Sequence, residues 1–356
     1  MRNILLSILA FVLVAGCQSN TSSGRMDGHA GTAGAADTTD ATNDFYDNAP
    51  ARSLEHNGQV QVQGEVEHPR KITFEGLPLR SVIVKETVLD GGKTEFVGAY
   101  RYEGYSLYDL LNHVDVDKAN KEDFAPIIDL YVTVSNAEGE KVVLSWGEIY
   151  YPVNRHQVLI ATRVTPILPS KTRERWPLPN DSRLVVGTDL VTGRNMARPT
   201  RISVHSLDAD FPVKGDLDSL YAPSVKVFHH GDSITTLHEP AGDHDLYSYP
   251  NTFYGRGRGI HGISRFDGYR LKDLLPGRDS LSTEYIRWGM YTIAAPDGYR
   301  AAFSYSEIMN RNDQSEALLM DRGAGRADGR WRLFMAADFF SDRAIKAVSQ
   351  IHLDKK

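Results

Sequence analysis

The chain of 356 residues contains 40 Lys and Arg, 46 Asp and Glu and a single Cys, and its formal net charge at pH 7 is −6. This nearly balanced charge excludes the strong positive field that is typical of nucleic-acid-binding proteins. One Cys cannot form an intramolecular disulfide, so apolar cores must stabilise the fold.

Residues 1–16 have the features of a signal peptide. Arg2 supplies a positive charge, and the apolar run Ile4–Val14 that follows is too short to cross a bilayer as a helix. The run ends in Val-Ala-Gly before Cys17, which resembles the bacterial lipobox, where the Cys is lipidated and becomes the mature N-terminus. We therefore expect an exported protein whose lipid on Cys17 anchors it in the cell envelope, at the outer membrane or the periplasmic face. An ordinary secretory signal is the alternative.

Residues 17–55 are predicted to be a flexible tether. Between Ser19 and Arg52 the chain is almost free of large apolar residues, so it cannot bury enough surface to offset the entropy lost on ordering. The rest of the chain is long enough for two domains of ordinary size. We place the first domain at residues 56–206, a linker at 207–221 and the second domain at 222–356.

The two predicted domains share an internal repeat. The phrase RYEGYSLYDLL at Arg101–Leu111 has a counterpart, RFDGYRLKDLL, at Arg265–Leu275. In both phrases a Gly permits a turn and three Leu follow at helical spacing, which predicts a turn and the start of a helix. Downstream, Val132–Ile149 aligns without a gap with Tyr291–Ile308. Alternating apolar residues around a central Gly predict a β-hairpin in each of these segments.

Both hairpins are followed by the same helix-start signal. Ser145-x-x-Glu148 and Ser304-x-x-Glu307 are capping boxes, in which the Ser oxygen accepts a free N–H and the Glu reaches back to the N–H of the Ser. A helix is therefore expected to begin directly after each hairpin. We assign both Ser residues to this structural role and expect no nucleophilic catalysis from them.

The last matching segments are short apolar strands and a closing region. The strands are expected at Val158–Ala161 and Leu318–Met320, and Arg183–Val204 then aligns without a gap with Arg332–Leu353. Because each repeat mixes strands with short helices, the sequence predicts an α+β fold that is present twice.

The ordered set of motifs resembles the molybdopterin-binding domain of the sulfite-oxidase type. The similarity covers Val60–Val204 and Ser224–Leu353, and it is better in the second of these regions. The motifs that carry it are the opening strand pair at Val62–Thr73, the phrase Gly-x-x-Leu-x-Asp-Leu-Leu at Gly104–Leu111 and Gly268–Leu275, Asp297-Gly298-Tyr299, and Arg332, Asp338, Arg343 and Ile351. The resemblance implies two tandem domains of that fold, with mixed sheets and short helices, and molybdopterin as their cofactor.

This chain departs from the family at the metal ligand. Active members bind molybdenum through a Cys thiolate in a loop ahead of the shared Gly-x-x-Leu phrase. The corresponding segments, expected here as loops at Lys85–Ala99 and Pro240–Ile263, contain no Cys. A thiolate is a soft, charged ligand that other side chains do not imitate, so the resemblance implies domains without the family's metal ligation. We therefore expect no cofactor, and molybdopterin held in another way is the alternative.

Basic residues late in each repeat are candidates for binding an anion or the phosphate of a pterin. In the family, a late basic residue contacts that phosphate, and Arg194, Arg343 and Lys346 occupy such positions. The alternative interpretation is that both arginines lie on the surface and pair with Asp189 and Asp338.

Gly and Arg alternate in Thr252–Phe266, which contains three further candidates for an anion or cofactor site, Arg256, Arg258 and His261. Glycines allow backbone N–H groups to approach an anion, and the arginines supply positive charge. His261 is also the residue that could ligate a metal in an oxidoreductase of atypical ligation. The alternative is a Gly-rich turn with solvated arginines.

His and carboxylate side chains are dense between His229 and Asp245. These are the ligands that zinc and similar metals prefer, and His229, His230, His238 and His244 are the candidates. Their spacing matches no recognised metal motif, and on a strand the adjacent His229 and His230 would point to opposite faces. A polar loop is therefore expected here, and a metal site is the alternative.

The sequence favours a lipid-anchored scaffold that binds a small anionic ligand or a protein partner without catalysis. This expectation rests on the family resemblance and on the missing Cys. A molybdopterin-dependent oxidoreductase with atypical metal ligation is the first alternative, and a metal-binding protein that uses His and carboxylate side chains is the second. The membrane is an expected partner through the lipid anchor, and nucleic acid is not.

Overall fold

A computed structural model describes residues 49–169, 174–208, 211–238, 244–257, 259–277 and 281–356, without the side chain of His261. The predicted signal peptide, Cys17 and most of the predicted tether lie outside these residues. The described chain is mostly β-structure in mixed sheets with short helices, which agrees with the predicted α+β class. Within this part of the chain, no helix has both the length and the apolar composition needed to cross a bilayer.

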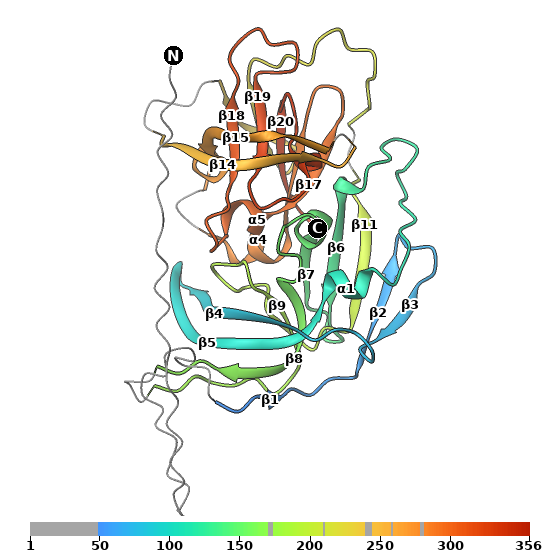
Figure 1. The fold of residues 1–356 in the computed structure, drawn as a ribbon, viewed down its shortest axis with the longest axis vertical. Coiled ribbons are helices and arrows are strands. Elements are labelled where there is room, and N and C mark those ends of the chain that lie inside the picture. The colour runs from blue at the N-terminus through green and yellow to red at the C-terminus, as the bar shows by residue number, and fades with distance from the viewer. Residues whose placement is uncertain (1–48, 170–173, 209–210, 239–243, 258, 278–280) are drawn as a thin grey trace, which may run out of the picture. The chain divides into compact units, whose positions relative to one another are not determined.

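Residues 49–206, called the first half below, form two sheets (Figure 1). One sheet has the strand order β10-β9-β8-β5-β4, with β1 paired to β8, and the other has the order β3-β2-β11-β6-β7. The strands are β1 (Arg52–Ser53), β2 (Gln59–Gly64), β3 (Arg70–Thr73), β4 (Arg80–Asp90), β5 (Lys93–Ser106), β6 (Leu130–Ser135), β7 (Lys141–Ser145), β8 (Val158–Pro166), β9 (Arg183–Val186), β10 (Met196–Ala197) and β11 (Arg201–Ser206). The helices are α1 (Leu107–Leu111), η1 (Ile127–Asp129) and α2 (Trp146–Tyr150).

Residues 222–356, called the second half, also form two sheets. Their strand orders are β13-β12-β20-β16-β17 and β14-β15-β18-β19. The strands are β12 (Val225–His229), β13 (Asp232–Leu237), β14 (Leu246–Gly255), β15 (Gly259–Arg270), β16 (Gly289–Ala294), β17 (Arg300–Ser304), β18 (Ala317–Asp321), β19 (Trp331–Met335) and β20 (Gln350–Lys355). The helices are α3 (Leu271–Leu274), α4 (Thr283–Trp288), α5 (Tyr305–Met309) and η2 (Ser341–Arg343).

The second half repeats the topology of the first. The order β13-β12-β20-β16-β17 corresponds strand by strand to β3-β2-β11-β6-β7, and β14-β15-β18-β19 corresponds to β4-β5-β8-β9. In both halves the first central strand pairs in parallel with the last, β2 with β11 and β12 with β20. The residue registers agree as well: Ile160 lies opposite Leu184, and the aligned Leu319 lies opposite Leu333. The internal sequence repeat is therefore matched by a repeat of strand order and register.

The predicted hairpins and helix starts are confirmed. Strands β6 and β7 pair around Gly139, and β16 and β17 pair around Gly298, with φ angles of 88° and 82° that favour Gly. Apolar residues alternate with polar ones along β6, and every second side chain is buried. Both capping boxes form, because Ser145 and Ser304 accept from the N–H three residues later and the Glu at that position accepts in return.

The turn expected at Gly104 and Gly268 is wrong. Strands β5 and β15 run through these two glycines, and helices α1 and α3 begin only after the strands end. A Cβ atom at Gly104 would lie 2.1 Å from the carbonyl oxygen of Ile160, and one at Gly268 would lie 3.0 Å from that of Leu319. The glycines are therefore explained by the close approach of the neighbouring strand, for which the sequence gives no direct signal.

The expected loops at Lys85–Ala99 and Pro240–Ile263 are corrected to long antiparallel hairpins, β4 with β5 and β14 with β15, although residues 239–243 and 258 lie outside the described chain. The polar loop expected after His229 is likewise a hairpin of β12 and β13 as far as Leu237. Polar residues alternate with apolar ones in these segments, because one face of each hairpin is exposed. The many polar residues made the segments resemble loops in the sequence.

The two halves share apolar packing. Most residues of the second-half core come from β16, β17, β18, β19 and the adjoining helices, but Phe124, Ile128, Tyr151 and Val191 of the first half belong to the same buried cluster. Two short β-bridges also join the halves, Pro152 with Asp338 and Asp189 with Arg311. Burying apolar side chains from both halves together stabilises their contact. All described residues belong to one compact unit, Thr39–Lys356.

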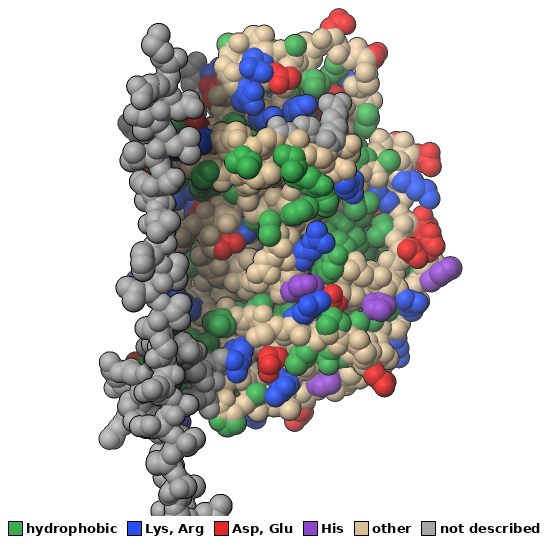
Figure 2. Space-filling model, viewed as in Figure 1, with side chains coloured by type: hydrophobic (Ala, Val, Ile, Leu, Met, Phe, Trp, Pro, Cys, Tyr) green, Lys and Arg blue, Asp and Glu red, His purple; other side chains and the backbone are tan. Residues whose placement is uncertain are grey.

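On the face shown in Figure 2, basic and acidic side chains are interspersed. This agrees with the nearly balanced counts of 40 basic and 46 acidic residues in the chain. Any local positive site must therefore come from a small number of cations that are not neutralised by neighbouring carboxylates.

Candidate anion-binding site

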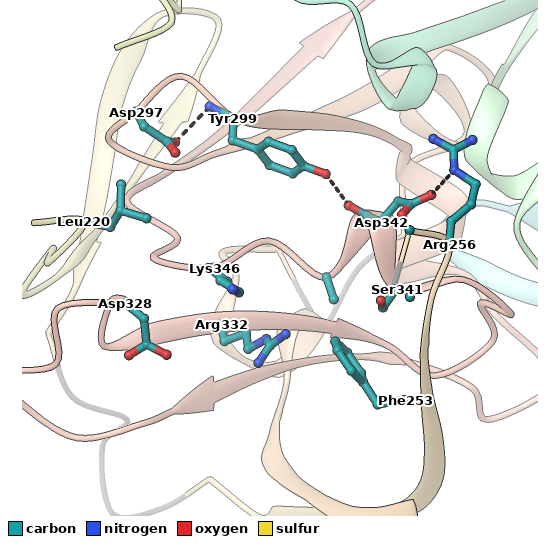
Figure 3. A pocket seen from close by; sticks show the side chains of 13 residues that line it. Leu220, Phe253, Arg256, Asp297, Tyr299, Asp328, Arg332, Ser341, Asp342 and Lys346 are labelled. Carbon is teal, nitrogen blue, oxygen red and sulfur yellow. Dashed lines mark hydrogen bonds and ion pairs between the residues drawn. The ribbon is translucent and has the colours of Figure 1, made fainter. Parts of the chain in front are cut away.

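A cavity of about 730 Å³ opens in the second half (Figure 3). Its walls are the end of β14 with the residues that follow, the turn between β16 and β17, strand β19, and the segment Ser341–Lys346. The apolar part of the lining includes Phe253 and Leu220. A cavity of this size that combines apolar and polar lining has the character of a small-molecule site.

Three cations and three carboxylates line the cavity, and most of them are paired. Arg256 Nε lies 3.3 Å from a carboxylate oxygen of Asp342. The carboxylate of Asp297 accepts a hydrogen bond from the backbone N–H of Tyr299 at 3.0 Å, as Figure 3 shows. Asp328 is bound at 3.0 Å by Arg326, which does not line the cavity. The carboxylates of the site are therefore engaged by other groups.

Arg332 and Lys346 are the remaining cations of the lining. Within the described part of the chain, neither side chain forms an ion pair. Arg332 is half-buried, and its guanidinium lies 4.8 Å from the ring centroid of Phe253. Burial lowers the pKa of Arg332, and the like charge of Arg322 lowers it further. The charge of Asp328, whose carboxylate binds Arg326, acts in the opposite direction on this pKa. A cation that is partly removed from water and forms no ion pair favours the binding of an anion.

The sequence singled out six candidates for anion binding, five Lys or Arg residues and one His. Of these, the structure places Arg256 and Lys346 in the cavity lining. Arg258 lies outside the described residues, and His261 lies on β15 with its side chain outside them. Sequence reasoning missed Arg332 as a site residue. Its alignment with Arg183 in the repeat was visible, but only the structure shows that the two arginines have different surroundings.

Arg194 lies elsewhere, in the contact between the halves, and its side chain is 0% exposed. Its guanidinium donates two hydrogen bonds to Asp189, at 2.6 and 2.9 Å, and two to Glu148, both at 2.9 Å. It also donates to Ser304 Oγ of the second half at 3.1 Å. Burial alone would lower the pKa of Arg194, but the charges of Asp189 and Glu148 outweigh this effect and raise it.

Arg343 makes the corresponding set of contacts from the second half, and its side chain is 1% exposed. It binds Asp338 at 2.7 and 2.9 Å and Glu307 at 2.8 Å, and it lies 3.5 Å from Ser145 Oγ of the first half. The alternative pairing of Arg194 and Arg343 with Asp189 and Asp338 is therefore confirmed, but the surface position expected for these pairs is wrong. Neither arginine lines the cavity.

His229 and His230 lie against the same phenol, Tyr285. His229 Nε2 and His230 Nε2 are both within hydrogen-bonding distance of Tyr285 Oη, the latter at 3.0 Å, and the two imidazole centroids are 4.6 Å apart. The opposite-face arrangement of adjacent strand residues does not apply here, because β12 ends at His229 and His230 adopts a φ of 50° in the turn before β13. His238 and His244 are described but join no such group: among described residues, no three His, Cys, Asp or Glu side chains gather as a metal site.

No protein-family description matches the chain, and no curated protein is similar to it.

Proposed function

We propose that this chain is an exported, lipid-anchored protein that binds a small anionic ligand without catalysis, in the cavity of the second half. The observation that carries the proposal is that Arg332 and Lys346 line this cavity and form no ion pair within the described residues. An anion bound to either of them would accept charge-assisted hydrogen bonds, which are the stronger kind.

We also propose that each half has the molybdopterin-binding fold of the sulfite-oxidase type. The motif order of the sequence and the repeated pair of mixed sheets support this. The cavity fits one part of the implied cofactor, because Arg256, Arg332 and Lys346 are suited to a phosphate. It does not fit the metal part, because the only Cys of the chain, Cys17, lies in the predicted lipobox. The function we propose therefore contains no redox step.

The proposal is tested by measuring anion binding to the wild-type protein and two variants. Isothermal titration with small organic and inorganic anions should give saturable binding to the wild type. Arg332→Ala and Lys346→Ala should each weaken it roughly tenfold or more, since a hydrogen bond to a charged group contributes about 1.5–3 kcal/mol. Lys226→Ala is the matched control, because Lys226 is exposed on β12 and lies outside the cavity lining. Equal loss in all three variants, or no saturable binding to the wild type, would contradict the proposal.

A second measurement separates this function from its alternatives. The protein is produced in a host that makes molybdopterin, purified, and analysed for molybdenum, zinc, copper and pterin. We expect none of them at stoichiometric amount. Stoichiometric molybdenum with pterin would instead establish a molybdopterin oxidoreductase. Zinc or copper that is lost when His229 and His230 are replaced by Gln would establish the metal-binding alternative.

A further inference from the structure

The hairpins β4/β5 and β14/β15 are irregular at the same place, and this identifies which of their residues correspond. Glu86 pairs with Gly98 directly before the β-bulge of the first hairpin. Phe253 pairs with Gly262 directly before the bulge of the second hairpin. A bulge shifts the register of every residue beyond it, so a shared bulge position fixes the correspondence on both sides. Phe253 therefore occupies in the second half the place that Glu86 occupies in the first.

The arginine that faces this place is present in both halves. Arg183 on β9 and Arg332 on β19 occupy matching positions in the registers of their strands. In the first half, Arg183 Nη1 lies 3.5 Å from Glu86 Oε1, and the Glu86 side chain is buried. In the second half, the guanidinium of Arg332 faces the ring of Phe253. The second half has thus kept the cation and lost the carboxylate that neutralises its counterpart.

The two other partners of the Glu86 carboxylate have changed in the same way. Tyr102 Oη donates a hydrogen bond to Glu86 at 3.0 Å, and Asn195 Nδ2 donates one at 2.9 Å. In the alignment of the halves, Phe266 and Ala344 take the places of Tyr102 and Asn195, and neither side chain can donate a hydrogen bond. The first half therefore holds a carboxylate of its own chain, whereas the second half has a cavity in the corresponding region.

We infer that the ligand of this cavity is an organic acid. Its carboxylate lies beside Arg332, in the place that corresponds to the Glu86 carboxylate beside Arg183. This inference rests on the proposed binding function and adds the chemical class of the ligand. The planar guanidinium matches a carboxylate with two parallel hydrogen bonds. In the first half the site is closed by Glu86, so the protein is expected to bind one equivalent of the acid.

The rest of the lining agrees with an organic acid. Lys346, which aligns with Ala197 in the first half, adds a second cation on the cavity wall. Phe253 and Leu220 offer apolar surface to the body of the ligand. Benzoate combines a carboxylate with an apolar ring, so it is the probe for this class, and inorganic phosphate is the comparison anion.

The decisive variant is Phe253→Glu in the full chain. It restores at the equivalent place the carboxylate that the first half possesses, and this side chain should pair with Arg332 and exclude the ligand. Phe253→Gln is the matched control, because it has nearly the same size and no charge. Benzoate should bind Phe253→Glu at least tenfold more weakly than Phe253→Gln, and Phe253→Glu should have the higher thermal midpoint. Equal benzoate affinity of the two variants would overturn the inference.

The reverse change provides a second test in the first half. Glu86→Ala leaves Arg183 without its carboxylate, so added acetate should raise the thermal midpoint of this variant more than that of the wild type. Sodium chloride at equal ionic strength controls for screening and should not distinguish the two proteins. The same acetate response in Glu86→Ala and the wild type would count against Glu86 as an internal equivalent of the ligand.

Binding to the wild type distinguishes failure of the proposed function from failure of the inferred ligand class. If the wild type binds neither benzoate nor phosphate, both the proposed function and the inferred ligand class are contradicted. If the wild type binds phosphate but not benzoate, the proposed function stands and the assignment of a carboxylate ligand is overturned. Benzoate binding at one equivalent that is lost in Phe253→Glu supports both.

Discussion

Arg194 of the first half donates a hydrogen bond to Ser304 Oγ of the second half at 3.1 Å. Ser304 is also the N-cap of helix α5, so one hydroxyl both begins a helix and holds the opposite half. The counterpart of this contact joins Arg343 to the other N-cap, Ser145, whose hydroxyl also donates a hydrogen bond to Glu307. The two capping boxes are therefore part of the contact between the halves as well as local helix starts.

Loss of the Arg194 guanidinium should destabilise the protein severely. Arg194→Met keeps most of the side-chain volume but leaves the buried carboxylates of Asp189 and Glu148 without their cation. Breaking a buried ion pair in this way costs about 3–5 kcal/mol. Urea unfolding should therefore show this decrease in the free energy of unfolding. Arg163→Met is the control, because its pair with Glu103 is partly exposed and should contribute about 1 kcal/mol or less. A similar effect of the two substitutions would contradict the assigned role of Arg194.

Gly147 should not tolerate a methyl group. A Cβ atom there would lie 2.1 Å from Arg343 Nη1, and Arg343 is held by carboxylates on both sides. Ala is the better helix former, yet Gly147→Ala should lower the free energy of unfolding by about 1–3 kcal/mol because the site is already filled. Gly215→Ala, where a Cβ meets no atom within 4 Å, should change it by less than about 0.5 kcal/mol. Thermal or urea unfolding of the two variants tests this contrast.

The contact between the halves should weaken as the pH rises above the ordinary carboxyl range. Burial raises the pKa of Glu148, and although the charge of Arg194 lowers it, burial together with the neighbouring charge of Glu307 outweighs this effect. A carboxyl group whose folded-state pKa exceeds its unfolded value stabilises the fold fully below the unfolded pKa, about 4.3 for Glu, and this contribution is lost as the pH rises through the folded pKa. Glu148→Gln should therefore flatten the decline of unfolding free energy from about pH 4.5 upward. An unchanged slope would argue against this origin.

If Cys17 carries a lipid anchor, its replacement should change the location of the protein in the cell. Wild-type protein expressed in a bacterial host should sediment with membranes, and detergent should release it. Cys17→Ala removes the thiol that the lipobox resemblance marks for lipidation, so the variant should lose membrane association. Cell fractionation with immunoblotting measures this outcome. Wild-type protein found entirely in the supernatant would refute the anchor.

Several features could be predicted from the sequence because they depend on neighbours along the chain. Alternating apolar residues around Gly139 and Gly298 predicted two hairpins, and the spacing of Ser145 and Glu148 predicted a helix cap. The internal repeat predicted that one topology occurs twice. The turn predicted at Gly104 was wrong, because Gly is favoured both in turns and where two strands approach closely.

Only part of the candidate site could be predicted from the sequence. Arg256 and Lys346 were recognised by type and position, but Arg332 was not, because its equivalent Arg183 looks identical in the sequence. Whether such an arginine is neutralised depends on a residue of another hairpin, Glu86 in one half and Phe253 in the other. That pairing follows from the register of strands that are far apart along the chain.

The sequence by itself determined the repeated order of hairpins, caps and strands, and the absence of a thiolate from both repeats. The tertiary structure alone decided which charges are satisfied. It buries Arg194 and Arg343 between carboxylates, and it leaves Arg332 beside an aromatic ring at the wall of a cavity. The physical reason is that the free energy of a charge depends on its solvent and its counter-charges, and both are set by residues that only folding brings together.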